Sequence, residues 1–243
     1  MPLQPVTRRS VPDEVFDQVL GEVVAGRFGA GEALPSERRL AEVLGVSRPA
    51  VREALQRMAQ TRLVEVRHGG ATTVRDFQRY AGLDLLPTLL VRGGSVDLSV
   101  ARSVVEARLL IGPGVAALAA ERRTPALSGR LTDVVDAYAT CDEMVEAQRL
   151  ALTYWDLVVD AADSVTFRLL FNSLRAAYEP ALNVLAPVLG SHVGAGSTRA
   201  GSYRVLTAAI GEGDPDTARA AAERVLRAST DALLTALDAA EAR

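Results

Sequence analysis

Apolar residues recur every three or four positions through most of the chain, the period that predicts amphipathic α-helices. In the first quarter, Pro12 suits a first helical turn, and Ser36 and Ser47 can cap two further helix starts. Gly45 can end a helix in the left-handed conformation. We therefore expect three consecutive helices there. They are residues 12–27, 36–45 and 47–62.

The pattern then changes to strict alternation over residues 63–67 and 72–75, on either side of the sequence HGGA. Two short alternating runs around a glycine turn predict a β-hairpin. Three helices followed by a hairpin outline a winged helix-turn-helix, and we assign it to residues 1–76.

From residue 77 onward the pattern is helical only, and the breaks are rich in Gly, Pro and Asp. We expect a linker and first helix over residues 77–95 and an all-α antiparallel bundle over residues 96–243. The predicted fold class is thus mostly α. The expected helices are residues 80–91, 98–122, 125–141, 143–162, 166–189, 199–212 and 215–242.

Charge distinguishes the two parts of the chain. The whole sequence carries a formal net charge of −3, but residues 36–75 hold eight arginines against four glutamates. A basic module joined to an acidic body is typical of a nucleic-acid-binding head, although a solvated helix face would show the same excess. The composition also favours helices, because Ala, Leu and Val are far more frequent than aromatic residues.

Cys141 is the only cysteine, so an intrachain disulfide is excluded and a reducing compartment fits. The first residues lack the apolar core of a signal peptide, and no run approaches the roughly 20 apolar residues that span a bilayer. We expect a cytoplasmic protein without a membrane partner.

The sequence ALPSERRLAEVLGVSRPAVREALQRM carries the most specific signal. Its apolar positions would pack the second and third helices across the GVS turn, and these are Leu40, Ala41, Leu44, Val46, Val51, Leu55 and Met58. Ser47, Arg48 and Arg52 stay outside, at the start of the third helix, where a recognition helix presents base-reading groups. Either arginine can hold guanine through two acceptors. Ser47 and the helix amides can hold a phosphate.

These residues, with LVEVRHGGATTV, resemble the winged-helix head of the GntR family of transcription regulators, over about residues 11–76. The resemblance implies a double-stranded DNA operator as partner. Thr72 is a further candidate phosphate donor. The contacts that the resemblance implies are Arg38, Ser47, Arg48 and Arg52, with His68 and Gly69 at the tip of the wing.

The body resembles the ligand-binding domain of the FadR subfamily, many members of which hold a metal through one Asp and three His. Here the whole chain has only His68 and His192, so a three-histidine site cannot be built. The residues where ligands would stand are Ala151, Trp155, Tyr203 and Val225, which do not suit a divalent cation. We therefore expect no metal cofactor.

Within that subfamily, SVVEARLLI, LLFNSLRAAY and GSYRVLTAAIGEG are similar to the fatty-acid-responsive FadR regulators. The resemblance implies a long-chain acyl-CoA effector, with Arg108 for a CoA phosphate, Tyr178 and Tyr203 in the pocket, and Ser229 near the thioester. Leu233 stands where those regulators have a pocket tryptophan, which leaves acyl length and ligand class open.

The residues themselves also favour an effector site that needs no metal. A bundle without metal ligands must recognise an effector through apolar surface and a few polar groups. Arg108, Asn172 and Arg175 could supply the polar groups, although an ion pair of Arg108 with Glu106 and a hydrogen bond between helices at Asn172 are open alternatives. Plain core packing would equally explain the apolar candidates. Those are Trp155, Phe167, Leu170, Phe171 and Leu174.

An enzyme is disfavoured, because the sequence offers no nucleophile elbow, glycine-rich phosphate loop or His–Asp–Ser set. The function expected is a homodimeric, ligand-responsive regulator on a palindromic operator, whose effector is an acyl-CoA or fatty acid. Two alternatives stay open: a sensor of a small organic acid bound by arginines, and a body that serves only dimerisation or protein docking.

Overall fold

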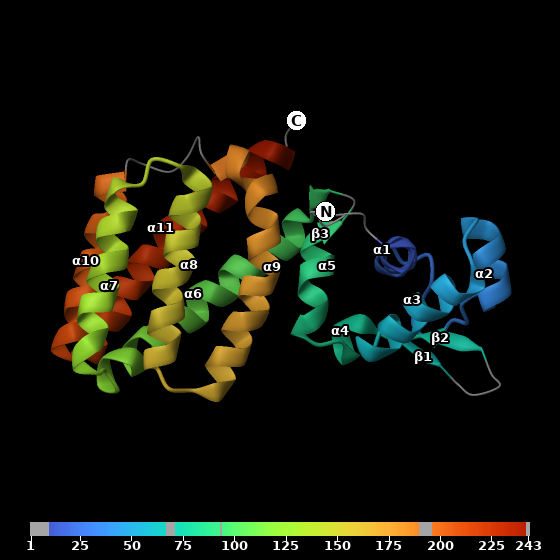
Figure 1. The fold of residues 1–243 in the computed structure, drawn as a ribbon, viewed down its shortest axis with the longest axis horizontal. Helices are drawn as coiled ribbons and strands as arrows, with labels where there is room; N and C mark the ends of the chain where they lie inside the picture. Colours follow the sequence, from blue (N-terminus) through green and yellow to red (C-terminus); the bar gives the residue numbers. More distant parts are fainter. Residues whose placement is uncertain (1–9, 67–70, 93, 190–195, 242–243) are drawn as a thin grey trace, which may run out of the picture. The chain divides into compact units, whose positions relative to one another are not determined.

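The computed structural model describes residues 10–66, 71–92, 94–189 and 196–241, and the side chains of these except residues 183–189, 196–199, 232 and 236–241. The chain forms two compact units that divide between Thr88 and Leu89, within the segment expected as a linker. Each unit is described by itself. The mostly helical fold class is confirmed, with a small hairpin in the first unit (Figure 1).

The first unit, hereafter the head, begins with α1 (Val11–Val24), α2 (Glu37–Leu44) and α3 (Arg48–Gln60). The hydroxyls of Ser36 and Ser47 accept backbone N–H groups of the first turns of α2 and α3, as expected of capping serines. Gly45 ends α2 with φ +66°, the left-handed conformation that glycine adopts without strain. The core of the head is buried apolar surface from all three helices, including Leu20, Val51 and Met58.

The hairpin of the head consists of β1 (Val64–Val66) and β2 (Thr72–Val74), paired antiparallel with Val64 opposite Val74. A second partner lies on the other edge of β2. The Leu34 N–H donates to the Thr72 carbonyl and the Val74 N–H to the Glu32 carbonyl, each at 2.8 Å, next to a bridge between Ala33 and Thr73. The segment that leads into α2 is therefore joined to the hairpin.

The single helix expected over residues 80–91 is wrong. The chain instead forms α4 (Phe77–Tyr80), a 3₁₀ turn (Leu83–Leu85) and α5 (Leu86–Leu90), and then the short strands β3 (Val91–Arg92) and β4 (Ser95–Val96), which pair with each other. Gly82 separates the first two pieces in an extended conformation. Gly94, with φ +83°, forms the turn between the strands, where the sequence pattern predicted only a break.

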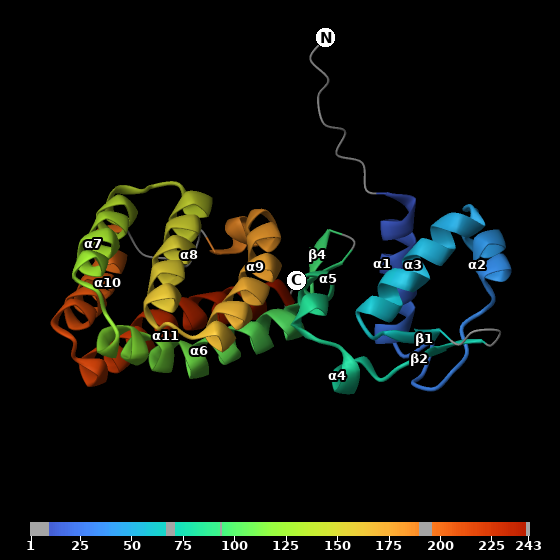
Figure 2. The ribbon, with the colours of Figure 1, turned by 60° about the horizontal axis from the view of Figure 1, so that its bottom comes forward.

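The second unit, hereafter the body, is an antiparallel helical bundle (Figure 2). Its core is apolar and includes Leu131, Tyr154, Val158, Leu206 and Ile210, all almost completely buried. The bounds agree with the expected helices within a few residues. The helices are α6 (Leu98–Glu121), α7 (Pro125–Thr140), α8 (Met144–Ala161), α9 (Val165–Leu189), α10 (Gly196–Glu212) and α11 (Pro215–Glu241).

Helix α6 is long and apolar enough to cross a membrane by length and composition, so the expectation that no segment reaches this threshold is wrong. The helix nevertheless packs in the bundle, chiefly against α11 and α8. Gly112 allows this close approach, because a Cβ atom there would collide with the Leu226 side chain. Val105, Ala116 and Ala120 of the same helix are buried in the body.

Candidate nucleic-acid interface and ligand pocket

The start of α3 presents two exposed arginines on one helix face. Arg48 and Arg52 are four residues apart, and their side chains are 59% and 55% exposed. The Ser47 hydroxyl accepts the Ala50 N–H at 3.4 Å, so its own O–H remains able to donate outward. Ser47, Arg48 and Arg52, all predicted from the sequence, thus lie together at the N-terminal end of the candidate recognition helix.

Glu37 of α2 holds one of these arginines. The Arg52 Nε donates to both Glu37 oxygens at 3.1 and 3.2 Å, and Nη2 donates to one of them at 2.8 Å. The Arg48 guanidinium is 4.0 Å from the same carboxylate. The Arg52 guanidinium holds the pKa of Glu37 below its ordinary value, so the carboxylate is charged at neutral pH. Sequence reasoning missed Glu37, although it lies in the LPSER motif beside Arg38.

The other predicted DNA contacts are placed as follows. Arg38 is exposed on α2 and donates to Glu42 at 3.2 Å, within the same helix. Thr72 begins β2, with its carbonyl hydrogen-bonded to Leu34. His68 and Gly69 lie outside the described residues. The structure thus brings the arginines of α2 and α3 into one helix-turn-helix.

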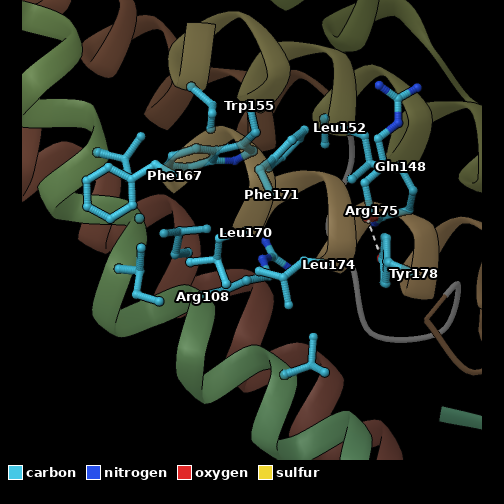
Figure 3. A pocket seen from close by; sticks show the side chains of 17 residues that line it. Arg108, Gln148, Leu152, Trp155, Phe167, Leu170, Phe171, Leu174, Arg175 and Tyr178 are labelled. Atoms are coloured by element: carbon cyan, nitrogen blue, oxygen red, sulfur yellow. Dashed lines mark hydrogen bonds between the residues drawn. The ribbon is translucent and has the colours of Figure 1, made fainter. Parts of the chain in front are cut away.

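The body contains a pocket between α6, α8 and α9, with one residue from α11 (Figure 3). The enclosed cavity is small, with a volume of about 90 Å³, and it opens widely to solvent; about 800 Å³ of empty space is present when the solvent at its mouth is included. Most of its wall is apolar. The lining residues are Val104, Arg108, Ile111, Gly112, Val115, Gln148, Ala151, Leu152, Trp155, Val159, Phe167, Leu170, Phe171, Leu174, Arg175, Tyr178 and Leu226.

Polar groups gather at one end of this pocket, where Arg175, Gln148 and Tyr178 are labelled in Figure 3. The Tyr178 hydroxyl donates to the Gln148 side-chain oxygen at 3.0 Å. Trp155 and Phe167 lie at the opposite end, and Arg108 lies between the two ends (Figure 3).

The two pocket arginines differ in their partners. Arg175 donates to Asp156 at 3.4 Å and to Glu179 at 3.2 Å, so two carboxylates already balance its charge. Among the residues that the structure describes, no hydrogen bond or ion pair joins Arg108 to a carboxylate, and the alternative pairing with Glu106 is not observed. A half-buried guanidinium without a counter-charge is costly, and a bound anion would relieve that cost.

The charge of Arg108 acts on two tyrosine hydroxyls. Burial raises the pKa of Tyr178 and of Tyr203, while the positive charge of Arg108 opposes both increases. Both phenols are therefore neutral hydrogen-bonding groups at physiological pH. The Trp155 indole N–H, close to the Tyr203 hydroxyl, has no acceptor of good geometry in the described part of the chain.

Four of the seven predicted ligand residues line the pocket: Arg108, Trp155, Arg175 and Tyr178. The other three lie apart from its wall. Tyr203 is buried among aromatic rings, with its ring centre 4.8 Å from that of Tyr154 and 5.3 Å from that of Tyr138. Asn172 is exposed on α9, and Ser229 donates to the Leu226 carbonyl of its own helix. Gln148 and Leu152 were missed by sequence reasoning.

The pocket does not fit a metal ion. Ala151 and Trp155, which stand where two ligands would be expected, line the wall without a coordinating atom. Val225 is buried and apolar, and burial keeps Tyr203 protonated. Within the described ranges, no three His, Cys, Asp or Glu side chains come together as a metal site. His192 lies outside those ranges.

Comparison with known families matches both units. Residues 12–74 match the family described as bacterial regulatory proteins, gntR family, and residues 103–228 match the FCD domain. A chain 53% identical over 237 residues, covering 98% of this chain and 97% of its own, is the HTH-type transcriptional regulator Mce2R of Mycobacterium tuberculosis. The chain belongs to the GntR family. This GntR protein is a DNA-binding transcription regulator and not an enzyme, as the sequence analysis predicted.

More distant relatives extend the comparison. An uncharacterized HTH-type transcriptional regulator of M. tuberculosis, Rv0494, is 30% identical and covers 93% of this chain and 90% of its own. The fatty acid metabolism regulator protein of Vibrio cholerae is 29% identical over 144 residues, which are 59% of this chain and 49% of its own. The FadR-type resemblance of the GntR protein is therefore confirmed at the level of homology.

Solved structures show the same fold. A GntR-family regulator from Pseudomonas syringae pv. tomato has a TM-score of 0.52 at 15% identity, covering 96% of this chain and 88% of its own. Lar, which controls expression of the Listeria monocytogenes agr system, has a TM-score of 0.56 at 13% identity, covering 95% and 99%. At these identities the likeness concerns the fold alone.

Proposed function

We propose that this GntR regulator binds a fatty acyl ligand, as the free acid or the CoA thioester, in the pocket between α6, α8 and α9. The observation that carries the proposal is the pairing of an apolar wall with one guanidinium, Arg108, that has no carboxylate partner among the described residues. A fatty acid offers one negative group and an apolar chain, which matches this distribution. The name of the V. cholerae relative, a fatty acid metabolism regulator, supports the same class of effector.

We further propose that no metal takes part in effector binding. The donor set around the pocket supports this, because its polar groups are arginine, glutamine and phenol rather than carboxylate and imidazole. The Arg108 guanidinium would then supply the positive charge that a metal ion supplies in metal-dependent relatives.

The regulator would act in the cytoplasm as a homodimer on a palindromic operator, with Arg38, Ser47, Arg48, Arg52 and the wing in contact with DNA. Effector binding in the body would weaken operator binding. A coupling free energy of about 1–3 kcal/mol corresponds to a change of about 5- to 150-fold in affinity.

Thermal unfolding with a panel of ligands tests the effector. A ligand present at about 100 times its dissociation constant stabilises the folded state by about 2.7 kcal/mol. We expect long-chain fatty acids or acyl-CoAs to raise the melting temperature, with and without EDTA. Comparison of the free acid with the thioester distinguishes the two forms. Stabilisation by short organic acids alone would favour the small-acid sensor, and no stabilisation by any ligand would favour a dimerisation body.

The operator and the dimer are tested by separate measurements. Sedimentation should give a mass of two chains. Operator affinity should fall steeply with salt, since phosphate contacts release counterions. Arg48→Ala should lose operator selectivity and keep its melting temperature; unchanged selectivity would contradict the assigned role of Arg48.

A further inference from the structure

Glu37 occupies an unusual position for an acidic residue in a DNA-binding surface. It is the first residue of α2, yet its carboxylate reaches across the turn to the recognition helix α3. There it contacts Arg52 through three hydrogen bonds and comes within 4.0 Å of Arg48. An acid that faces phosphate repels it, so some other contribution must offset that cost.

The geometry of the contact indicates that contribution. A guanidinium has five N–H donors in a rigid, planar fork. Glu37 takes the side of this fork, the edge made by Nε and Nη2 of Arg52. The end of the fork, made by Nη1 and the second N–H of Nη2, has no partner among the described residues. That end is the edge that can donate to O6 and N7 of guanine together.

We propose that Glu37 is a positioning residue that sets the Arg52 fork for guanine and makes operator recognition more selective. The proposal rests on the DNA-reading role of Arg52 in the proposed function. A charge-assisted, two-donor contact fixes both the direction and the plane of the guanidinium. An arginine held in this way loses less rotamer freedom on meeting its base than a free arginine does.

The charge of Glu37 has a second effect on selectivity. Arg48 and Arg52 share this one carboxylate, so the three side chains together carry a single positive charge. Without Glu37, both arginines would be free to turn toward any nearby phosphate, which binds DNA without reading sequence. Glu37 thus lowers affinity for arbitrary DNA while it supports the contact with one base.

The test uses the full-length protein and a randomised duplex DNA pool. Wild type, Glu37→Gln, Glu37→Asp and Arg52→Ala are each used to select bound sequences, and Arg52→Ala identifies the base pair that Arg52 reads. Glu42→Gln is the matched control. It removes the same charge from the same helix, and Glu42 also pairs with two arginines, Arg38 and Arg39, but with none from α3. Melting temperatures verify that every variant is folded.

We expect Glu37→Gln to lose the guanine preference at the position that Arg52→Ala identifies, by about fivefold or more, the range of one bidentate contact. Glu37→Asp keeps the charge but shortens the reach, and it should lose the same preference without a gain in affinity for random DNA. Glu42→Gln should keep the preference. The double variant Glu37→Gln/Arg52→Ala should discriminate no worse than Arg52→Ala alone.

Two results would contradict different steps of the proposal, the role of Arg52 or the role of Glu37. If Arg52→Ala alters selection at no position, the assigned role of Arg52 fails. If Arg52→Ala alters one position and both Glu37 variants keep the preference there, the positioning role of Glu37 fails while the role of Arg52 stands. If Glu42→Gln lost the guanine preference to the same extent, the change in net charge alone would explain the effect. That result would also contradict the proposal.

Discussion

The hydroxyl groups of Tyr154 and Thr207 lie 3.1 Å apart in the core of the body and join α8 to α10. Tyr154 is 1% exposed and Thr207 is 6% exposed, so neither hydroxyl has water as an alternative partner. A buried polar group that loses its partner costs more free energy than the hydrogen bond contributes. Each hydroxyl therefore needs the other as its hydrogen-bond partner.

Thr207→Val should lower the free energy of unfolding by about 1–3 kcal/mol, because it leaves the Tyr154 hydroxyl buried and unpaired. Denaturant unfolding measures the change. The double variant Tyr154→Phe/Thr207→Val should recover much of the loss, since both polar groups are then absent. A double variant as unstable as the sum of the two single variants would show that the hydroxyls are not coupled.

Arg108→Gln should abolish stabilisation by the effector while the unliganded protein stays as stable as wild type. The reason is that Arg108 has no carboxylate partner in the described structure, so its removal breaks no ion pair. Arg175→Gln is the matched control on the same pocket, and it loses contacts with Asp156 and Glu179 instead. Isothermal titration with the ligand identified by thermal unfolding measures both. Weaker binding in Arg175→Gln than in Arg108→Gln would reverse the assignment of the anion site.

Gly45→Ala should destabilise the head by about 1 kcal/mol, because Gly45 ends α2 with φ +66° and a side chain is strained there. No atom lies within 4 Å of the added Cβ, so the cost is conformational and not steric. Gly21→Ala is the control. It also has open space, but it lies inside α1, where alanine is favoured by about 0.5–1 kcal/mol. Thermal unfolding should show opposite signs for the two variants.

Asp13 should stabilise the head at neutral pH and lose this effect at acidic pH. Hydrogen bonds from Ser10 and then from Arg57 hold the pKa of this carboxyl below its ordinary value. A depressed pKa stabilises the fold above the pKa of an unfolded aspartate, about 3.9, and this contribution is lost as the pH falls through the lower, folded value. The melting temperature of Asp13→Asn should thus lie below that of wild type at pH 7, and the difference should shrink below about pH 4. Glu14→Gln, in the same helical turn, should show a smaller difference at pH 7.

The head was largely predictable because its signals are local. Capping serines, the glycine after α2 and the spacing of apolar residues each act within a few positions, and the helices appear where these residues place them. The Glu37–Arg52 contact was not predictable in this way. It depends on the crossing of two helices, which brings together side chains that are 15 residues apart.

The candidate site of the body was less predictable than its helices. Its helices follow the periodicity, but apolar residues that face a pocket and those that fill a core have the same pattern in sequence. Only the packing of α9 against α8 and α11, which leaves a pocket toward α6, separates Leu170 and Phe171, which line the pocket, from Leu206 and Ile210, which lie in the core. The prediction of a single helix over residues 80–91 was wrong for another reason: Gly82, in an extended conformation, interrupts an apolar run that otherwise resembles one helix.

The hydrogen bonds on both edges of β2 have a consequence for how the protein behaves in concentrated solution. An unpaired strand edge is a template on which another chain can add a strand and begin to aggregate. In the hairpin, β2 is covered by β1 on one side and by the residues before α2 on the other. The inner strand of the wing is therefore protected from strand addition while the protein is free of DNA.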